Sequence, residues 1–172
     1  GVPLSVWLLN ERSRLGVFEA GISQPREMSA LCHIIRPTLG VLTNIGPAHQ
    51  ENFATLEEKC LEKLKLFKHA DALVYNADNE LIVRCLAEAD FAGERISWSR
   101  HSSRAAYTFK VHPEGDSTRI VCHHAGQPLC DFHIPFSDEA SIENAITAFV
   151  TVCSLPSEAL PLPALHELGE RM

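Results

Sequence analysis

The sequence predicts an α/β fold, a mostly parallel sheet with flanking helices followed by a small antiparallel β meander. Short apolar runs alternate with amphipathic helical patterns over residues 1–93, which is typical of parallel crossovers. Short strand-like runs separated by turn signals fill residues 94–136, and helical spacing returns over 137–172. We expect these three stretches to be parts of one central domain.

The first half of the chain alternates strand and helix. Residues 1–14 begin apolar and turn polar, as at the end of a helix and its loop. The run 15–20 (LGVFEA) fits a short buried strand, and a helix is expected over 25–35 because Pro25 is well placed in a first turn. Residues 39–43 form the second expected strand.

A capping box predicts where the next helix begins. The Thr55 hydroxyl would accept from the amide three residues on, while Glu58 reaches back. The helix should extend to about His69, with one buried face at the three-four spacing of Leu56, Cys60, Leu64 and Phe67.

The second half changes from helices to short strands. Residues 71–76 form a third expected strand, ended by the turn 77–79 and followed by a helix over 80–89. The meander strands are expected at 96–99, 107–112, 119–124 and 129–134, then a helix over 138–153 and a last one opened by Pro161 or Pro163.

Composition excludes several classes of protein. The 172 residues are 45% hydrophobic and 22% charged, with no apolar run near the roughly 20 residues of a membrane helix. A net charge of -7 without a basic stripe gives nucleic acid no electrostatic footprint. The six cysteines form no CxxC pair, which favours free thiols and a cytoplasmic location.

The run from Thr43 to Asn52 brings an amide, an imidazole and a carboxylate to the end of an apolar strand. Ligands of open α/β sheets bind at such strand ends. Glu19 follows the preceding expected strand, so Glu19 and His49 could together meet one Mg²⁺, which keeps waters and binds substrate phosphates. A solvated glutamate and an ordinary hydrogen-bonded histidine are the plainer interpretations.

Lys63 lies on the capped helix, one turn after Lys59 and beside Leu64. Charged neighbours on both sides favour a solvated lysine on a polar helix face. Spacing alone gives Lys63 no catalytic role.

Five ordered segments resemble a known family. They are FEAGISQP, IIRPTLGVLTNIGPAHQENF, EKLKLF, YNADN and DEASIENAITAF, and they reach from Glu19 to Phe149. Together they are similar to the central ATP-binding domain of the Mur ligases. Within that family they most resemble the members that join D-alanyl-D-alanine to a UDP-N-acetylmuramoyl-tripeptide. The wording of AGISQP and TNIGPAHQENF is similar to the form fused to alanine racemase.

The resemblance implies ATP-dependent amide formation in peptidoglycan precursor synthesis. ATP phosphorylates the peptide carboxylate, and the dipeptide amine attacks the acyl phosphate. Glu19 and His49 match the family's magnesium ligands, and Asn44 matches a polar residue near the phosphates and the metal. Lys63 matches a lysine that many members carry as a carbamate, an anionic metal ligand, so the implied catalytic residues are Lys63, His49 and Asn44. Asn144 matches the asparagine that contacts adenine.

The chain also departs from the family pattern. No G-x-x-x-x-G-K-[ST] phosphate loop occurs in it, and the resembling proteins carry that loop upstream of Gly1 and a closing domain beyond Met172. We therefore expect an excised fragment, without the N- and C-terminal domains of its polypeptide and inactive alone. Ala140-Ser141 replaces the usual histidine and asparagine, and Arg26 stands where glycine is expected. The turn 76–79 matches a family feature, although a strand-ending turn explains it equally well.

Three other functions compete with the ligase hypothesis. A zinc site would use the cluster Cys122, His123, His124, Cys130 and His133, but strand alternation splits these residues between two faces. The chain could also be a non-catalytic nucleotide- or metal-binding module of the same fold, or part of a ligase like folylpolyglutamate synthase. A phosphate loop in the upstream sequence of the parent gene would exclude the non-catalytic module.

Overall fold

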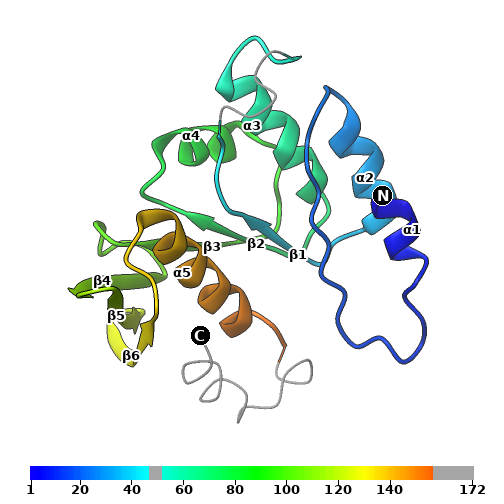
Figure 1. Cartoon of the computed structure of the whole chain (residues 1–172). Coiled ribbons are helices and arrows are strands. Elements are labelled where there is room, and N and C mark those ends of the chain that lie inside the picture. Colours follow the sequence, from blue (N-terminus) through cyan, green and yellow to red (C-terminus); the bar gives the residue numbers. More distant parts are fainter. Residues whose placement is uncertain (47–51, 157–172) are drawn as a thin grey trace. The chain divides into compact units, whose positions relative to one another are not determined.

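The computed structural model describes residues 1–46 and 52–156. Its strands form one mixed sheet in the order β1-β2-β3-β4-β5-β6 (Figure 1). The strands are β1 (Leu39–Leu42), β2 (Ala72–Asn76), β3 (Glu94–Ser99), β4 (Tyr107–Glu114), β5 (Ser117–His124) and β6 (Gln127–Ile134). The helices are α1 (Val2–Val6), α2 (Glu27–Ile35), α3 (Leu56–Leu64), the 3-10 turn η2 (Lys65–Phe67), α4 (Glu80–Glu88) and α5 (Glu139–Cys153). The predicted α/β class is confirmed.

The chain divides into two compact units, which are described separately. The helical unit comprises residues 1–40, 44–73 and 79–94 and holds α1 to α4. The sheet unit comprises residues 41–43, 74–78 and 95 onward and holds β4 to β6 and α5. Within the described residues, no helix is long and apolar enough to cross a membrane.

Helix packing forms the core of the helical unit. Helix α3 contacts α2, η2 and α4, as the spacing of its apolar positions predicts. Close packing also requires Gly40, because a Cβ there would lie 2.6 Å from Phe67 Cδ1. The buried side chains include Met28, Cys32, Leu64, Phe67, Ile82 and Leu86.

An antiparallel meander and one helix form the core of the sheet unit. Strands β4 and β5 pair antiparallel with Phe109 opposite Cys122, and β5 and β6 pair with Ile120 opposite Phe132. The Phe149 ring of α5 lies 6.1 Å from that of Phe109 and 5.1 Å from that of Phe132. Helix α5 therefore covers the inner face of the meander.

The pairing direction of β3 differs from the prediction. The sequence pattern predicts antiparallel pairing, but Trp98 and Tyr107 align β3 parallel to β4. The Ser99 hydroxyl accepts hydrogen bonds from the amides of His101 (3.0 Å) and Ser102 (2.6 Å). These bonds turn the chain out of β3 into a loop and replace the tight hairpin that an antiparallel return needs.

The predicted strand over residues 15–20 is wrong. These residues have no regular secondary structure, and Val17 is 87% exposed. An apolar run becomes a strand only when a neighbour pairs with its backbone, and no described strand pairs with this one. The last expected helix, at Pro161 or Pro163, lies outside the described residues.

Candidate functional site

The candidate site is built on the loop that follows β1. After Leu42 the chain runs through Thr43, Asn44, Ile45 and Gly46 without regular structure. The Asn44 side-chain oxygen accepts a hydrogen bond from the Ile45 amide at 2.7 Å, while the Ile45 side chain is buried. The loop is therefore anchored by an apolar side chain and leaves Asn44 exposed.

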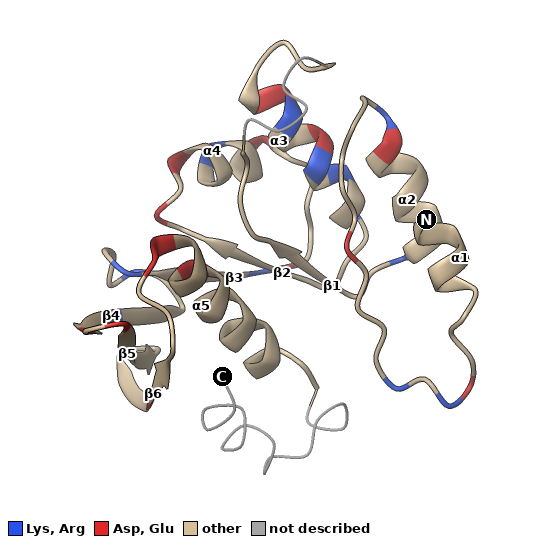
Figure 2. Ribbon diagram, viewed as in Figure 1, with Lys and Arg blue, Asp and Glu red and all other residues tan. Residues whose placement is uncertain are grey.

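Two lysines of α3 hold the backbone of this loop. The Lys59 ammonium donates to the Gly46 carbonyl at 2.7 Å, and the Lys63 ammonium donates to the Asn44 carbonyl at 3.4 Å. Lys59 is only 3% exposed and Lys63 is half-buried. The plainer interpretation of Lys63 as a solvated lysine does not describe this geometry. Figure 2 shows charges of both signs along α3.

The predicted capping box fixes the residue at which α3 begins. It therefore also fixes where Lys59 and Lys63 lie along the helix axis. The Thr55 hydroxyl accepts from the Glu58 amide at 3.0 Å, and the Glu58 carboxylate accepts from the Ala54 amide at 2.8 Å. Because side chains four residues apart share one face of a helix, Lys59 and Lys63 reach the same loop.

Burial lowers the pKa of the Lys63 ammonium, and the positive charge of Lys59 lowers it further. A lysine with a lowered pKa carries more neutral amine at a given pH below its ordinary value. The neutral amine is the nucleophilic form that reacts with CO₂ or another electrophile. Lys63 therefore lies in an environment that favours chemical modification.

Sequence reasoning missed the part played by Lys59. The sequence pattern groups its side chain with the charged face of the helix, yet it is buried and bonded to Gly46. A signal was present in the sequence, because Lys59 directly precedes Cys60, one of the apolar positions of the same helix, and lies one turn before Lys63.

The loop that contains Ser23 contacts Asn52, which follows the loop after β1 in the sequence. The Asn52 side chain donates to the Ser23 carbonyl at 2.9 Å, which joins the AGISQP and TNIGPAHQENF segments. The Glu27 carboxylate in turn accepts from the amides of Ser23 (2.7 Å) and Gln24 (2.9 Å). Arg26, which replaces an expected glycine, has a φ of 76°, the left-handed conformation that glycine adopts without cost.

The predicted metal ligands are not brought together within the described residues. His49 lies in 47–51, outside them. Glu19 is exposed and lines a shallow hollow of about 590 Å³ together with Phe18, Leu8 and other residues of the first 19. No cluster of three or more histidine, cysteine, aspartate or glutamate side chains in the described ranges could hold a metal ion, which also gives no support to the zinc alternative.

The polar turn after β2 is tied to its own surroundings. The Asn76 side chain accepts from the Asp78 amide at 2.8 Å and donates to Glu143 at 3.4 Å. The Asp78 carboxylate accepts from the Ser99 hydroxyl and from the Arg100 amide. These contacts are those of a strand-ending turn. Asn144 lies beside Glu143 in the second turn of α5 and is exposed.

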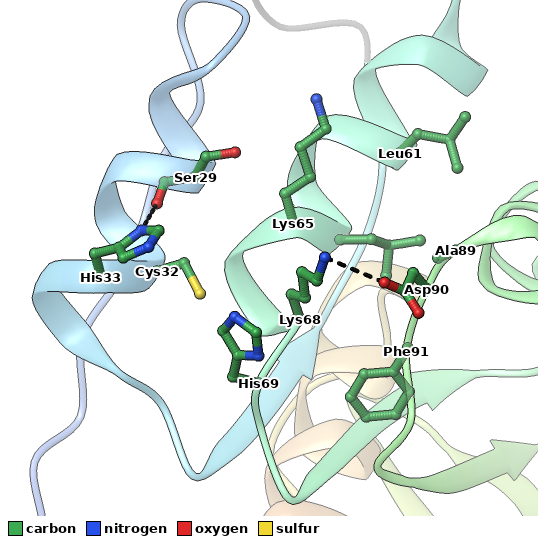
Figure 3. Close-up of a pocket in the computed structure, with 11 residues that line it drawn as sticks. Ser29, Cys32, His33, Leu61, Lys65, Lys68, His69, Ala89, Asp90 and Phe91 are labelled. Carbon is green, nitrogen blue, oxygen red and sulfur yellow. Dashed lines mark hydrogen bonds and ion pairs between the residues drawn. The ribbon is translucent and has the colours of Figure 1, made fainter.

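A pocket elsewhere in the helical unit contains none of the predicted site residues. It measures about 380 Å³ and lies between α2, the end of α3 and the residues after α4 (Figure 3). Its polar groups are largely satisfied by one another. Lys68 pairs with Asp90 at 3.1 Å, and the His33 ring donates from Nδ1 to the Ser29 carbonyl at 2.7 Å.

Known proteins resemble the chain in sequence and in fold. A model of the Mur ligase middle domain matches residues 1–152. The UDP-N-acetylmuramoyl-tripeptide--D-alanyl-D-alanine ligase of Borreliella burgdorferi is 32% identical over 97 residues, which cover 56% of this chain and 21% of that protein.

Two solved structures share the fold. MurF from Acinetobacter baumannii superposes with a TM-score of 0.77 and 17% identity, over 95% of this chain and 35% of that one. MurF ligase from Thermotoga maritima, in complex with ADP, gives a TM-score of 0.63 and 18% identity, over 77% of this chain and 31% of that one. The chain thus spans between a fifth and about a third of the length of these relatives.

Proposed function

This chain belongs to the Mur ligase family, of which it carries the middle domain, and we propose that it serves the ATP-dependent joining of D-alanyl-D-alanine to a UDP-N-acetylmuramoyl-tripeptide. The similarity to a ligase with that name supports the choice of substrates. The activity belongs to the whole protein, since the chain covers 21% of that relative. Fusion to an alanine racemase stays a prediction.

The contact between Lys63 and the strand-end loop is the observation that carries this proposal. A lysine of lowered pKa reaches the backbone of Asn44, where ligands of α/β sheets bind. We assign Lys63 the role of the carbamate-bearing lysine. The ammonium first loses one proton; the neutral amine then attacks the carbon of CO₂, the N–C bond forms as one C=O π bond becomes a carboxylate oxygen, and the nitrogen loses a second proton, so that a cation is replaced by an anion.

The modification would make Lys63 fit a Mg²⁺ ion beside Glu19. Mg²⁺ prefers oxygen ligands, and an amine offers none, whereas a carbamate on Lys63 does. Glu19, His49 and the modified Lys63 would hold the ion. When bound, Mg²⁺ neutralises charge on the phosphate oxygens of ATP.

Asn44 and Asn144 are assigned to the nucleotide. The Asn44 side-chain oxygen already accepts a hydrogen bond from the Ile45 amide. The NH₂ group of Asn44 can therefore donate to a phosphate oxygen. Asn144 is exposed on α5 and is assigned to the adenine. The ADP complex of the Thermotoga maritima relative supports a nucleotide ligand of this kind.

The proposed chemistry is a phosphoryl transfer followed by an acyl transfer. The tripeptide carboxylate oxygen attacks the γ-phosphorus of ATP and ADP leaves, which gives an acyl phosphate. The amine of D-alanyl-D-alanine then attacks the acyl carbon, inorganic phosphate leaves and the ammonium loses its proton. Amide formation outcompetes hydrolysis only if water is excluded, which is the task of closing domains in such enzymes.

The test is an assay of the whole protein that contains this chain. Phosphate release should require ATP, the UDP-linked tripeptide and D-alanyl-D-alanine together. Release with a folate and glutamate instead would favour the folylpolyglutamate-type alternative. No turnover, together with the lack of a G-x-x-x-x-G-K-[ST] segment upstream of residue 1, would favour the non-catalytic module.

A further inference from the structure

The β5–β6 hairpin places two cysteines directly opposite each other. Cys122 of β5 and Cys130 of β6 are register partners in an antiparallel pair. Directly opposed residues in such pairs have Cα atoms about 4.5 to 5.5 Å apart, inside the range of about 4.4 to 6.8 Å that a disulfide bond spans. The register therefore places the two Cα atoms within the span of a disulfide bond, next to an irregularity of the ladder between Cys122 and His123.

The two thiols also point to the same side of the sheet and interact. The two side chains are close enough to shift each other's pKa, while the Cys122 thiol donates a weak hydrogen bond to the His123 carbonyl at 3.8 Å. Cys122 lies on the face that carries Ile120, and Cys130 lies on the face that carries Phe132. Ile120 and Phe132 are themselves register partners, so one face of the hairpin carries all four side chains.

Cys122 and Cys130 differ in solvent exposure. A reactive pair needs one thiol that an oxidant in solution can reach. Cys130 is exposed, while Cys122 is fully buried behind it. Interaction with the Cys122 thiol lowers the pKa of the Cys130 thiol, and the same interaction, with burial, raises the pKa of Cys122. Of the chain's cysteines, Cys130 thus combines access to solvent with stabilisation of its thiolate.

We propose that Cys122 and Cys130 form a reversible oxidation site whose oxidant is a small hydroperoxide. The Cys130 thiolate attacks the O–O bond, an S–O bond forms, and the alcohol or water leaves with a proton, which gives a sulfenic acid. The Cys122 sulfur then attacks the Cys130 sulfur, the S–S bond forms and the S–O bond breaks. The Cys122 proton leaves with the hydroxide as water. The two thiols lose two electrons and the peroxide gains them.

A second thiol pair in the same chain provides a comparison. Cys60 of α3 and Cys85 of α4 also lie close enough to shift each other's pKa, but they are 0% and 1% exposed. Burial raises the pKa of both thiols. A hydroperoxide reaches neither of them in the folded state, so this pair should stay reduced under conditions that oxidise Cys130.

Cys153 of α5 is the third thiol near the hairpin. It is partly exposed, and burial, with the charge of Cys130, raises its pKa to about 11. Its raised pKa makes Cys153 slower than Cys130 to attack the hydroperoxide, while the hairpin register, and not the pKa, selects Cys122 as the thiol that forms the disulfide.

The test is titration of the full chain with hydrogen peroxide, followed by alkylation of the remaining thiols and peptide mass mapping. We expect loss of the mass of two hydrogen atoms, a Cys122–Cys130 disulfide, and full recovery with a dithiol reductant. Cys130→Ser should abolish the reaction. Cys122→Ala should stop it at a Cys130 sulfenic acid that a 1,3-dione traps, and Cys153→Ser should leave it unchanged.

Three results would overturn the proposal. They are a Cys130–Cys153 disulfide in the wild type, earlier oxidation of Cys60 and Cys85, or direct passage of Cys130 to the sulfinic acid. Because the wild type and the exposed-site variant Cys130→Ser decide the matter, instability of Cys122→Ala would not affect the outcome. None of these readouts depends on ligase activity.

Discussion

The helical unit and the sheet unit differ in whether they bury charged side chains. The helical unit buries Lys59 and Glu62 on α3, and one Glu62 carboxylate oxygen has no hydrogen-bond partner among the described residues. The sheet unit buries an aromatic cluster instead, with Trp98 edge-on to Phe109. Buried charge costs free energy unless it is paired, so a fold keeps it where it has a use.

The difference indicates which unit holds the proposed carbamate-bearing lysine and which holds the aromatic core. Lys59 and Lys63 hold a loop at the end of a strand, where an ordinary core would place apolar side chains. The sheet unit also leaves one buried polar atom, Trp98 Nε1, without a hydrogen-bond partner among the described residues, but its helix α5 is capped locally, because the Asp138 carboxylate accepts from the Ser141 amide. Substitutions in the two units should therefore separate activity from stability.

The largest expected effect is on activity and comes from the helical unit. Lys63→Ala in the whole protein should lower ligase turnover by about 10²- to 10³-fold, the usual cost of one lost transition-state contact. Part of the loss should return with bicarbonate or a small carboxylate such as acetate, which can occupy the place of the carbamate. Steady-state phosphate release measures both.

Lys68→Ala is the matched control for this substitution. Lys68 lies one turn after η2 begins and pairs with Asp90 at the surface, where both side chains are exposed. Its removal should leave turnover unchanged. Wild-type turnover by Lys63→Ala would contradict the assignment of Lys63.

The next effect is on stability and comes from the sheet unit. Ile120→Ala removes a side chain with 0% exposure from the centre of the hairpin and should cost about 2 to 5 kcal/mol of unfolding free energy. Urea denaturation measures the loss, with Val121→Ala, on the other face, as the control. A cost within the error of that control would show that the meander is not the stabilising core.

A smaller effect should appear in the pH dependence of Lys63. Lys59→Met removes the positive charge that helps to lower the pKa of Lys63, so that pKa should rise but stay below its ordinary value, because burial is the larger cause. At a fixed pH below the ordinary lysine pKa, less neutral amine is then present and carbamate formation falls.

The pH profile of ¹³C-bicarbonate incorporation, followed by NMR, measures this shift. It should move to higher pH in Lys59→Met and stay in place in Lys65→Met, whose charge is not among the causes of the Lys63 shift. A profile that moves to lower pH in Lys59→Met would mean that Lys59 acts on Lys63 through something other than its charge.

The sequence alone predicted the local features of both units better than the features that depend on distant partners. The Thr55 and Asp138 caps and the turns between β4, β5 and β6 are local, so a few residues decide them. Residues 15–20 were misassigned because a strand depends on a pairing partner that local pattern cannot supply. Lys59 was missed for the same reason, since its partner, the Gly46 carbonyl, is 13 positions away.

The smallest effect should be the same in both units. Arg26 in the helical unit and Ala125 in the sheet unit have φ values of 76° and 49°, which L side chains adopt at a cost. Arg26→Gly and Ala125→Gly should each stabilise the protein by about 1 kcal/mol or less, because the strain that glycine removes is larger than the stability lost to its greater unfolded-state entropy. Ala30→Gly, at an exposed site in α2, should instead destabilise by about 0.5 to 1 kcal/mol. If thermal denaturation showed Arg26→Gly to be as destabilising as Ala30→Gly, the Arg26 turn would be held by contacts of the arginine side chain, and the two units would differ in their turns as well as in their cores.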